Sequence, residues 1–320
     1  MTIVVTGGAG YIGAHMAHSL LAAGERVVIV DDLRLGHREA VPEGATLIEA
    51  DVGDAKAMAD VLREHPAEAV MHFASYIQVG ESVKNPQKYY ENNLGAGLRL
   101  LDACVAAKVP AFILSSTAAV YGEPIRSPID EDHPKVPVSP YGASKLALEG
   151  ALAAYGAAYG LRFAALRYFN AAGAAFGLSE RHDPETHLIP LAIDAAMGTR
   201  PPLTVFGEDW PTPDGTCIRD YVHVLDLCDA HGRALDHVTG RGESGAFNLG
   251  SGDGASVRAV IDAVGRAVGK PVPYTVGPRR EGDPAVLVAS SAKAQSVLGW
   301  KPTRGLEAIV ADAVASRVAR

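Results

Sequence analysis

Four glycines lie within residues 7–13, between an apolar run at residues 3–5 and a run from residue 12 to 21 whose apolar residues have helical spacing. Gly8, Gly10 and Gly13 form the pattern G-x-G-x-x-G, which Gly7 extends. Glycine permits a sharp turn and close approach of a ligand, and the N–H groups at a helix start attract an anion. A strand, a glycine turn and a helix in this order predict a dinucleotide-binding unit.

Composition limits the classes of function that remain. The 320 residues are 48% hydrophobic, and this length indicates about two domains. The net charge is −8 and basic residues form no block, so neither nucleic acid nor a membrane is an expected partner. With no long apolar run and no signal peptide expected, we predict a cytoplasmic protein. Cys104, Cys217 and Cys228 lack metal-ligand spacing, so we predict no metal site and three buried, reduced cysteines.

Acidic residues follow two of the expected strands. Asp31 ends the strand at residues 26–30, about 20 residues past the glycines, where an adenosine ribose is held. This position favours NAD over NADP; the alternative is that Asp31 caps a turn or helix. Asp51 ends the strand at residues 45–50 and either binds the adenine amine or caps the following helix.

Strands and helices alternate through the first half of the chain, with further strands expected at residues 69–73, 111–114 and 163–167. This alternation predicts an α/β fold with a Rossmann-type, doubly wound parallel sheet. After residue 170 glycine and proline become frequent and the alternation breaks down. We therefore expect a dinucleotide-binding domain at residues 1–170 and a smaller, mixed α/β substrate domain at residues 171–320, with interwoven segments. The elements expected in the second part are helices at residues 188–197, 226–236, 256–268 and from 306, and strands at 203–206 and 246–249.

Two asparagines, Asn92 and Asn93, lie inside the long segment at residues 79–108. Asparagine is a poor helix former. We expect either that one of them is a pocket ligand or that both face solvent.

Tyr141 and Lys145 begin a helix expected to reach residue 159, and their spacing of four places both side chains on one face. A nearby ammonium would lower the pKa of the phenol from about 10 and make Tyr141 a general base toward an alcohol. A hydroxyl from the strand end, at Ser115, Ser116 or Thr117, would orient that alcohol. Tyr-x-x-x-Lys alone is common by chance, but together with the glycine turn it predicts removal of hydride from a carbinol.

Apolar residues lie on every side of the same helix. A helix of this kind is buried all round. One face can cover the sheet, so we expect a second subunit to cover the other.

Three segments together resemble the extended short-chain dehydrogenase/reductases: residues 6–13, Ser-Ser-Thr-Ala-Ala-Val-Tyr-Gly at 115–122, and Tyr-Gly-Ala-Ser-Lys at 141–145. Within that family the chain is most similar to the UDP-glucose 4-epimerases. More specific segments carry this likeness, at residues 79–83, 89–93, 166–170, 214–221 and 278–283. The resemblance covers nearly the whole chain.

The resemblance implies roles for individual residues. Thr117, Tyr141 and Lys145 would be catalytic. The residues that would bind NAD are Gly7, Gly10, Tyr11, Ile12, Gly13, Asp31, Asp32, Leu33, Asp51, Val52, Phe73, Ala74, Ser75, Asn92, Ser115, Tyr141, Lys145, Tyr168 and Phe169. The residues that would bind a UDP-hexose are Thr117, Asn170, His187, Leu188, Val205, Phe206, Arg219, Arg280 and Asp283. Arginine suits a diphosphate, so Arg219 and Arg280 would hold it from the second half of the chain.

The resemblance also implies a reaction and a homodimer. Tyr141 would take the proton of the sugar 4-hydroxyl while hydride passes from C4 to NAD. The 4-keto sugar would then turn about its link to the diphosphate and receive the hydride on its other face. NAD would be regenerated in each cycle and stay tightly bound.

The chain departs from the family pattern at three places. Phe-Ala-Ser-Tyr-Ile at residues 73–77 lacks a lysine that often lies near the nicotinamide phosphate. Residues 31–36 lack two hydroxyls and contain Arg34, which leaves the choice between NAD and NADP open. Leu287 lies where the family varies the rim of the sugar pocket, and its size favours hexoses without an N-acetyl group.

Other activities stay open. Related dehydratases and decarboxylases carry acidic residues after the serine/threonine, whereas Ala118 and Ala119 follow Thr117 here, which favours epimerisation. A UDP-pentose or UDP-uronate 4-epimerase is the nearest alternative, because one hydroxymethyl group changes little in a sequence. A non-catalytic NAD-binding sensor is an alternative of another class, and the intact catalytic trio argues against it.

Overall fold

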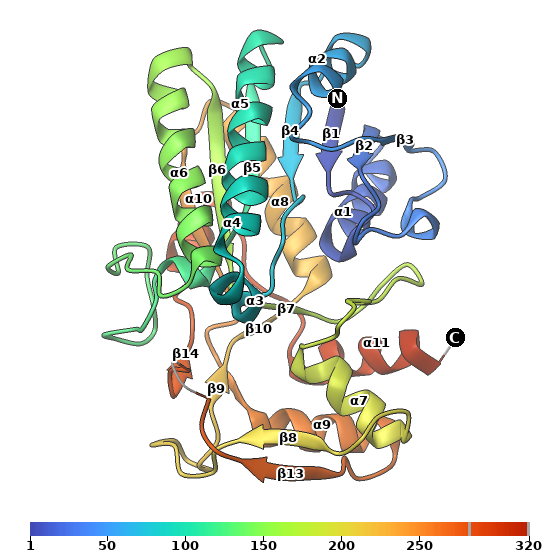
Figure 1. The fold of residues 1–320 in the computed structure, drawn as a ribbon, viewed down its shortest axis with the longest axis vertical. Helices are drawn as coiled ribbons and strands as arrows, with labels where there is room; N and C mark the ends of the chain where they lie inside the picture. Colours follow the sequence, from blue (N-terminus) through green and yellow to red (C-terminus); the bar gives the residue numbers. More distant parts are fainter. Residues whose placement is uncertain (281–282, 319–320) are drawn as a thin grey trace.

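A computed structural model describes residues 1–280 and 283–318 of the chain. Its largest element is a seven-stranded sheet with the strand order β11-β6-β5-β4-β1-β2-β3, in which every neighbouring pair is parallel (Figure 1). The strands are β1 (Thr2–Thr6), β2 (Arg26–Asp31), β3 (Thr46–Glu49), β4 (Ala69–His72), β5 (Ala111–Thr117), β6 (Arg162–Tyr168) and β11 (Gly245–Leu249). The predicted Rossmann-type α/β fold is confirmed.

Helices cover both faces of the sheet, as parallel strands require for their crossover connections. One face carries α1 (Tyr11–Ala22), α8 (Val224–Thr239) and α10 (Ala292–Leu298), and the other carries α2 (Ala55–Glu64), α5 (Gly97–Ala106) and α6 (Pro140–Tyr159). Alternate residues of β1 serve the two faces: Ile3 and Val5 pack in the core under α1, and Val4 packs in the core under α5. A strand buried on both faces is therefore apolar without interruption.

The long segment expected at residues 79–108 is not one regular helix. It comprises α3 (Val79–Lys84), α4 (Pro86–Tyr89), the π-helix η2 (Tyr90–Ala96) and α5. Short 3-10 turns, η1 (Arg38–Ala40) and η3 (Ala118–Val120), follow β2 and β5. Residues 121–139 contain no further helix or strand.

The later part of the chain forms a second group of elements below the sheet in Figure 1. Its helices are α7 (Leu188–Met197), α9 (Val257–Val268) and α11 (Leu306–Val318), which share one apolar core. Its strands form small sheets: β7 (Asn170–Ala172) with β10 (Tyr221–His223), β8 (Leu203–Phe206) with β13 (Tyr274–Gly277), and β9 (Ile218–Arg219) between β12 (Ala255–Ser256) and β14 (Val286–Leu287).

Segments of this later part return to the main sheet. β11 is its edge strand beside β6, and α8 and α10 pack on one of its faces. The two parts of the chain are thus interwoven in sequence, while the division into domains at residue 170 stays a prediction.

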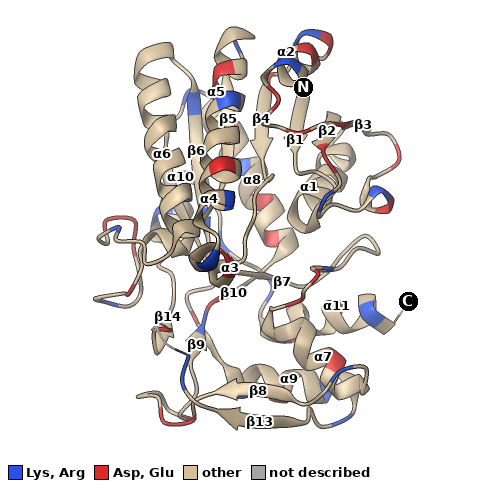
Figure 2. Ribbon diagram, viewed as in Figure 1, with Lys and Arg blue, Asp and Glu red and all other residues tan. Residues whose placement is uncertain are grey.

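Charged residues of both signs are interspersed along the ribbon (Figure 2). No helix within the described ranges combines the length and the apolar character needed to cross a bilayer.

The glycine turn between β1 and α1 packs directly on the end of β4. Gly7 has a φ of +72°, and a Cβ on it would lie 2.4 Å from the backbone nitrogen of Ala74. A Cβ on Gly13 would lie 2.2 Å from the carbonyl oxygen of Gly7. Both contacts are shorter than any that real side chains make, so only glycine fits at these two positions.

We expect Gly13→Ala to lower the free energy of unfolding by at least about 2 kcal/mol, because the added methyl displaces the backbone of the turn. Urea unfolding of the purified variant measures this change. Gly232→Ala in α8 is the matched control: its Cβ meets nothing within 4 Å. The control should be neutral or stabilised by about 0.5–1 kcal/mol. Equal stability of the two variants would contradict this account of the turn.

Candidate active site

A cavity of about 510 Å³ opens at the carboxyl ends of the central strands. Residues from the ends of β1, β2, β4, β5 and β6 line it, among them Gly7, Asp31, Phe73, Ser115 and Tyr168. The chain order of the sheet reverses on either side of β1, whose neighbours are β2 and β4. Ligands of doubly wound sheets bind at such a reversal.

Nearly all of the predicted cofactor residues line this one cavity. They are Gly7, Gly10, Tyr11, Ile12, Gly13, Asp31, Asp32, Asp51, Val52, Phe73, Ala74, Ser75, Asn92, Ser115, Tyr141, Lys145, Tyr168 and Phe169. The exception is Leu33, which does not line the cavity and instead donates its backbone N–H to Oδ1 of Asp31 at 2.9 Å. Leu33 therefore helps to orient the carboxylate of Asp31, which lines the cavity.

The first turn of α1 has the features of an anion site. Its N-cap is Gly10, and no side chain caps the helix. The positions of Gly7 and Gly13 leave no room for a Cβ, so the backbone itself forms the wall of the cavity here. Uncapped N–H groups behind a bare backbone fit the pyrophosphate of a dinucleotide.

Asp31 both caps a turn and lines the cavity. It lies at the end of β2 on the cavity, and its carboxylate accepts hydrogen bonds from the backbone of Ala9 at 3.0 Å and of Leu33 at 2.9 Å. Burial raises the pKa of Asp31, and these two hydrogen bonds oppose that rise. The carboxylate is thereby held in one orientation at the edge of the site.

Arg34 is neutralised by carboxylates that belong to the same site. Its Nε lies 2.8 Å from Oδ2 of Asp32, and its Nη2 pairs with Oδ2 of Asp51. The other oxygen of Asp51 accepts the backbone N–H of Gly53 at 2.7 Å in the turn before α2, whereas Asp54 and not Asp51 caps that helix. The guanidinium that left the cofactor choice open is therefore already bound to two anions.

The paired asparagines have different roles. Asn92 lines the cavity. Asn93 is buried, accepts the backbone N–H of Tyr76 at 2.9 Å and donates to its carbonyl oxygen at 2.9 Å. The π-helix η2 widens the turn that carries both residues. The alternative that both face solvent is wrong.

Thr117, Tyr141 and Lys145 meet at the cavity, from the end of β5 and the first turns of α6. Ser139 caps that helix by accepting the N–H of Gly142 at 3.2 Å. The expected lowering of the phenol pKa is wrong for the chain by itself: burial raises the pKa of Tyr141, and the hydroxyl of Thr117 opposes the rise. Lys145 instead donates to the carbonyl oxygen of Ser115 at 2.9 Å. Burial lowers the pKa of Lys145 to about 7.

A buried ion pair beneath Lys145 was not found from the sequence. Glu149 pairs with Arg167 at 2.6 Å between Oε2 and Nη2, and Ser116 donates to its Oε1 at 2.5 Å. Glu149 acts against the lowering of the Lys145 pKa. The signal was present, since Lys145 and Glu149 are four apart on α6 and share a face.

The predicted substrate residues divide into two groups. Thr117, Asn170 and His187 line the cavity, as does Leu287. The others lie outside its lining, although Arg219 stands opposite Leu287 in the β9–β14 pairing. Nη2 of Arg219 lies 3.6 Å from Oδ1 of Asp283. The guanidinium carbon of Arg280 lies 4.4 Å from the ring centre of Phe206.

Two of the predicted substrate residues face the second core. Leu188 and Val205 pack with the apolar cluster of α7 and α9. Their side chains are therefore turned away from the cavity that holds the catalytic trio.

Comparison with known proteins gives the family. The family model described as "NAD dependent epimerase/dehydratase family" matches residues 3–250. The chain belongs to this family.

Two UDP-glucose 4-epimerases are similar to this protein along nearly the whole chain. A UDP-glucose 4-epimerase of Rhizobium meliloti is 50% identical over 313 residues, which span 97% of this chain and 95% of the relative. The crystal structure of UDP-glucose 4-epimerase from Brucella ovis in complex with NAD has a TM-score of 0.96 and 45% identity, and covers 98% of this chain and 97% of that one.

A third family member was crystallised with a pentose. It is the UDP-glucose 4-epimerase from Stenotrophomonas maltophila with bound NAD and formylated UDP-arabinopyranose. Its TM-score is 0.96 at 38% identity, over 100% of this chain and 98% of that one.

The buried Lys145 generates a prediction about pH and stability. Its folded pKa of about 7 lies below that of the unfolded chain, so the unfolded state binds more protons between these two values. Stability contributed by this residue therefore rises with pH from about 7 toward about 10.4. Relative to Lys145→Met, the nucleotide-free wild type should gain on the order of 3 kcal/mol between pH 7 and pH 9.5.

Urea unfolding of both proteins at the two pH values measures this gain. Lys301→Met, at an exposed lysine, is the control and should show no such difference. A constant difference between Lys145→Met and wild type across this pH range would contradict a desolvated Lys145.

Proposed function

We propose that the protein is a UDP-glucose 4-epimerase, which inverts C4 of UDP-galactose and UDP-glucose reversibly. One observation carries the proposal: Thr117, Tyr141 and Lys145 converge on the same cavity that the glycine turn lines. The family membership and the near full-length similarity to UDP-glucose 4-epimerases support it.

NAD is the cofactor, held by the glycine turn, by Asp31 at the ribose and by the residues around Phe73 and Ser115. When bound, it would supply the acceptor for the hydride of C4 and the donor that returns this hydride to the opposite face of the sugar. We assign NAD rather than NADP, because Asp31 and Asp32 would repel a 2′-phosphate and Arg34 is already paired with two carboxylates.

The chain's own residues handle the proton. Tyr141 removes it from the sugar 4-hydroxyl and later restores it, and the hydroxyl of Thr117 supports the phenolate. Because burial raises the pKa of Tyr141, its deprotonation needs positive charge nearby. Lys145, with a pKa of about 7, supplies that charge when it is protonated.

The substrate spans both parts of the chain. Asn170 and His187 line the cavity beside the catalytic trio. Arg219 and Arg280 offer guanidinium groups suited to the diphosphate. Leu287 lies opposite Arg219 in the β9–β14 pairing, lines the cavity and would form the rim of the sugar pocket. An anchored diphosphate leaves the sugar free to turn over between the two half-reactions.

The function is tested with purified protein and no added cofactor. UDP-galactose, UDP-arabinopyranose and UDP-galacturonate are incubated separately, and the products are resolved by chromatography. Conversion of UDP-galactose to UDP-glucose is the expected result. Turnover of the pentose or the uronate alone would keep the mechanism and change the substrate. No turnover of any of them, even with NAD supplied, would contradict epimerisation.

A variant separates catalysis from cofactor binding. Tyr141→Phe should retain bound NAD and lose about 10³-fold in kcat, because the phenol oxygen is the proton acceptor. Tyr159→Phe, whose side chain is exposed on the same helix, should leave kcat unchanged. A Tyr141→Phe protein that keeps full biological effect without turnover would instead favour an NAD-binding sensor.

We also propose that the enzyme is a cytoplasmic homodimer. The three cysteines are free and buried, as expected in a reducing compartment. Small apolar residues of α6 are exposed: Ala147, Ala153, Ala154, Ala157 and Ala158. Tyr155 of the same helix donates to Asp102 of α5 at 2.5 Å, and the two helices lie side by side on the same face of the sheet (Figure 1). Small side chains would let a second copy of this face approach closely.

Ala154→Glu should convert the dimer to a monomer, since it would place a carboxylate at the centre of a face without a partner for it. Sedimentation velocity at micromolar concentration measures the change. Ala267→Glu, at an exposed alanine of α9, is the control and should stay dimeric. A wild type that sediments only as a monomer would contradict the proposal.

A further inference from the structure

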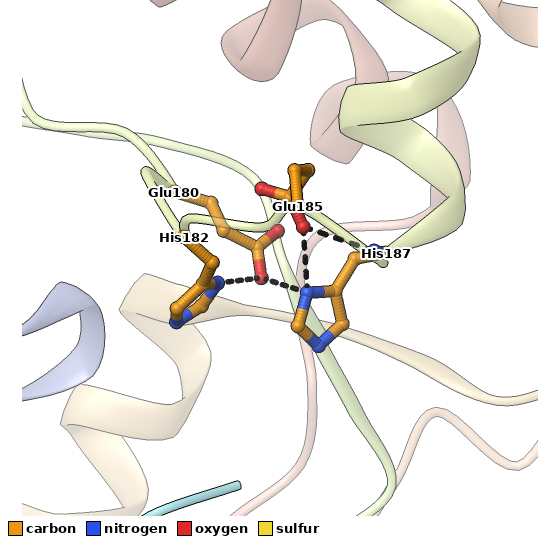
Figure 3. Close-up of side chains that lie close together, drawn as sticks. All are labelled: Glu180, His182, Glu185 and His187. Atoms are coloured by element: carbon orange, nitrogen blue, oxygen red, sulfur yellow. Dashed lines mark hydrogen bonds and ion pairs between the residues drawn. The ribbon is translucent and has the colours of Figure 1, made fainter. Parts of the chain in front are cut away.

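Four potential metal ligands lie within eight residues of the loop that precedes α7. They are Glu180, His182, Glu185 and His187, and one ligand atom from each lies within 4.8 Å of those of the other three. Figure 3 shows the two carboxylates and the two imidazoles turned toward one another. In the sequence these residues form the pattern Glu-x-His-x-x-Glu-x-His, which contains no cysteine.

The four side chains crowd around one point. Nδ1 of His187 lies 2.9 Å from an oxygen of Glu180 and 2.9 Å from an oxygen of Glu185. Nδ1 of His182 lies 3.2 Å from the same oxygen of Glu180. Donor atoms at the corners of a tetrahedron around zinc are about 3.4 Å apart, given metal–ligand bonds of about 2.1 Å. The cluster therefore needs only small adjustments to surround an ion.

One buried atom of the cluster has no hydrogen-bond partner among the described residues. It is Oε2 of Glu185, a residue that is 8% exposed. A buried oxygen of a carboxylate without a donor is costly. This oxygen belongs to the cluster, and a cation held among the four side chains would satisfy it.

The negative charge of the two glutamates also favours a bound cation. Two carboxylates, of which Glu180 is 6% and Glu185 is 8% exposed, lie close together and share Nδ1 of His187 as an ion-pair partner, with no lysine or arginine paired to either in the described part of the chain. A divalent cation would balance both carboxylates while the imidazoles bind it in their neutral form. The side chain of His187 is 40% exposed, which gives an ion access from the cavity.

We infer that Glu180, His182, Glu185 and His187 form a binding site for a divalent cation of the zinc type. Two imidazole nitrogens and two carboxylate oxygens are a common donor set for such ions. The site departs from the expectation of no metal, which rested on the cysteines alone. It does not depend on the proposed reaction.

The position of the site indicates a structural role. The loop that carries it forms one wall of the cavity, through Leu178, Arg181 and His187 among others. Arg181 reaches the segment after β2, where it pairs with Glu39 at 2.9 Å. An ion bound by Nδ1 of His187 would orient the ring and leave its other nitrogen directed away from the cluster (Figure 3). The cation would thus hold this wall in place.

Zinc itself is the probe. Tag-free protein is stripped with EDTA, incubated with Zn²⁺, desalted and analysed by plasma mass spectrometry. We expect about one zinc per chain in the wild type and a thermal unfolding temperature that rises when zinc is added. The His182→Ala/Glu185→Gln variant should bind zinc at least about tenfold more weakly. Glu64→Gln/His65→Ala, the same changes at the C-terminal end of α2, should bind like the wild type.

Equal zinc content in the wild type and in His182→Ala/Glu185→Gln would overturn the inference. A crystal of the zinc-loaded wild type decides the question even if that variant does not fold. An anomalous peak at the zinc edge among the four side chains supports the site, and a map without one rejects it.

Discussion

The close approach of the glycine turn to the end of β4 is the contact on which the rest of the site depends. Gly7 lies so near Ala74 that no side chain fits between them. This contact brings the start of α1, the end of β4 and the end of β2 to one edge of the sheet, where Asp31 accepts an N–H from the turn itself at Ala9. The cavity opens at that edge because the chain order reverses there.

Around this opening, burial of charge sets the chemistry. Lys145 lies 2% exposed above the Glu149–Arg167 ion pair, and its ammonium is destabilised by loss of water rather than by a neighbouring cation. Tyr141 is disfavoured as a phenolate for the same reason. Positive charge in the cavity, from Lys145 or from a ligand, would therefore favour release of the phenolic proton of Tyr141. The binding of ligands is in this way coupled to the proton transfer.

Loops rather than strands carry the features that distinguish this chain. Arg34 follows β2, and its two ion pairs tie Asp32 to Asp51 across the edge of the cavity. The loop at residues 177–187 closes another side and joins the two parts of the chain through Arg181 and Glu39. A rigid sheet with variable loops is the usual way in which one fold supports different ligands.

The sequence by itself determined the strands of the parallel sheet and the glycine turn, since these follow from local periodicity and from motifs of fixed spacing. The resemblance of the sequence to a known family indicated most of the other residues around the cavity. Only the tertiary structure decided the state of those residues. The pKa of Tyr141 is raised and not lowered, Arg34 is neutralised by Asp32 and Asp51, and Leu188 and Val205 turn toward the second core. Loss of water and contacts between distant segments have no signature in a linear pattern, because both depend on what the rest of the fold places alongside each side chain.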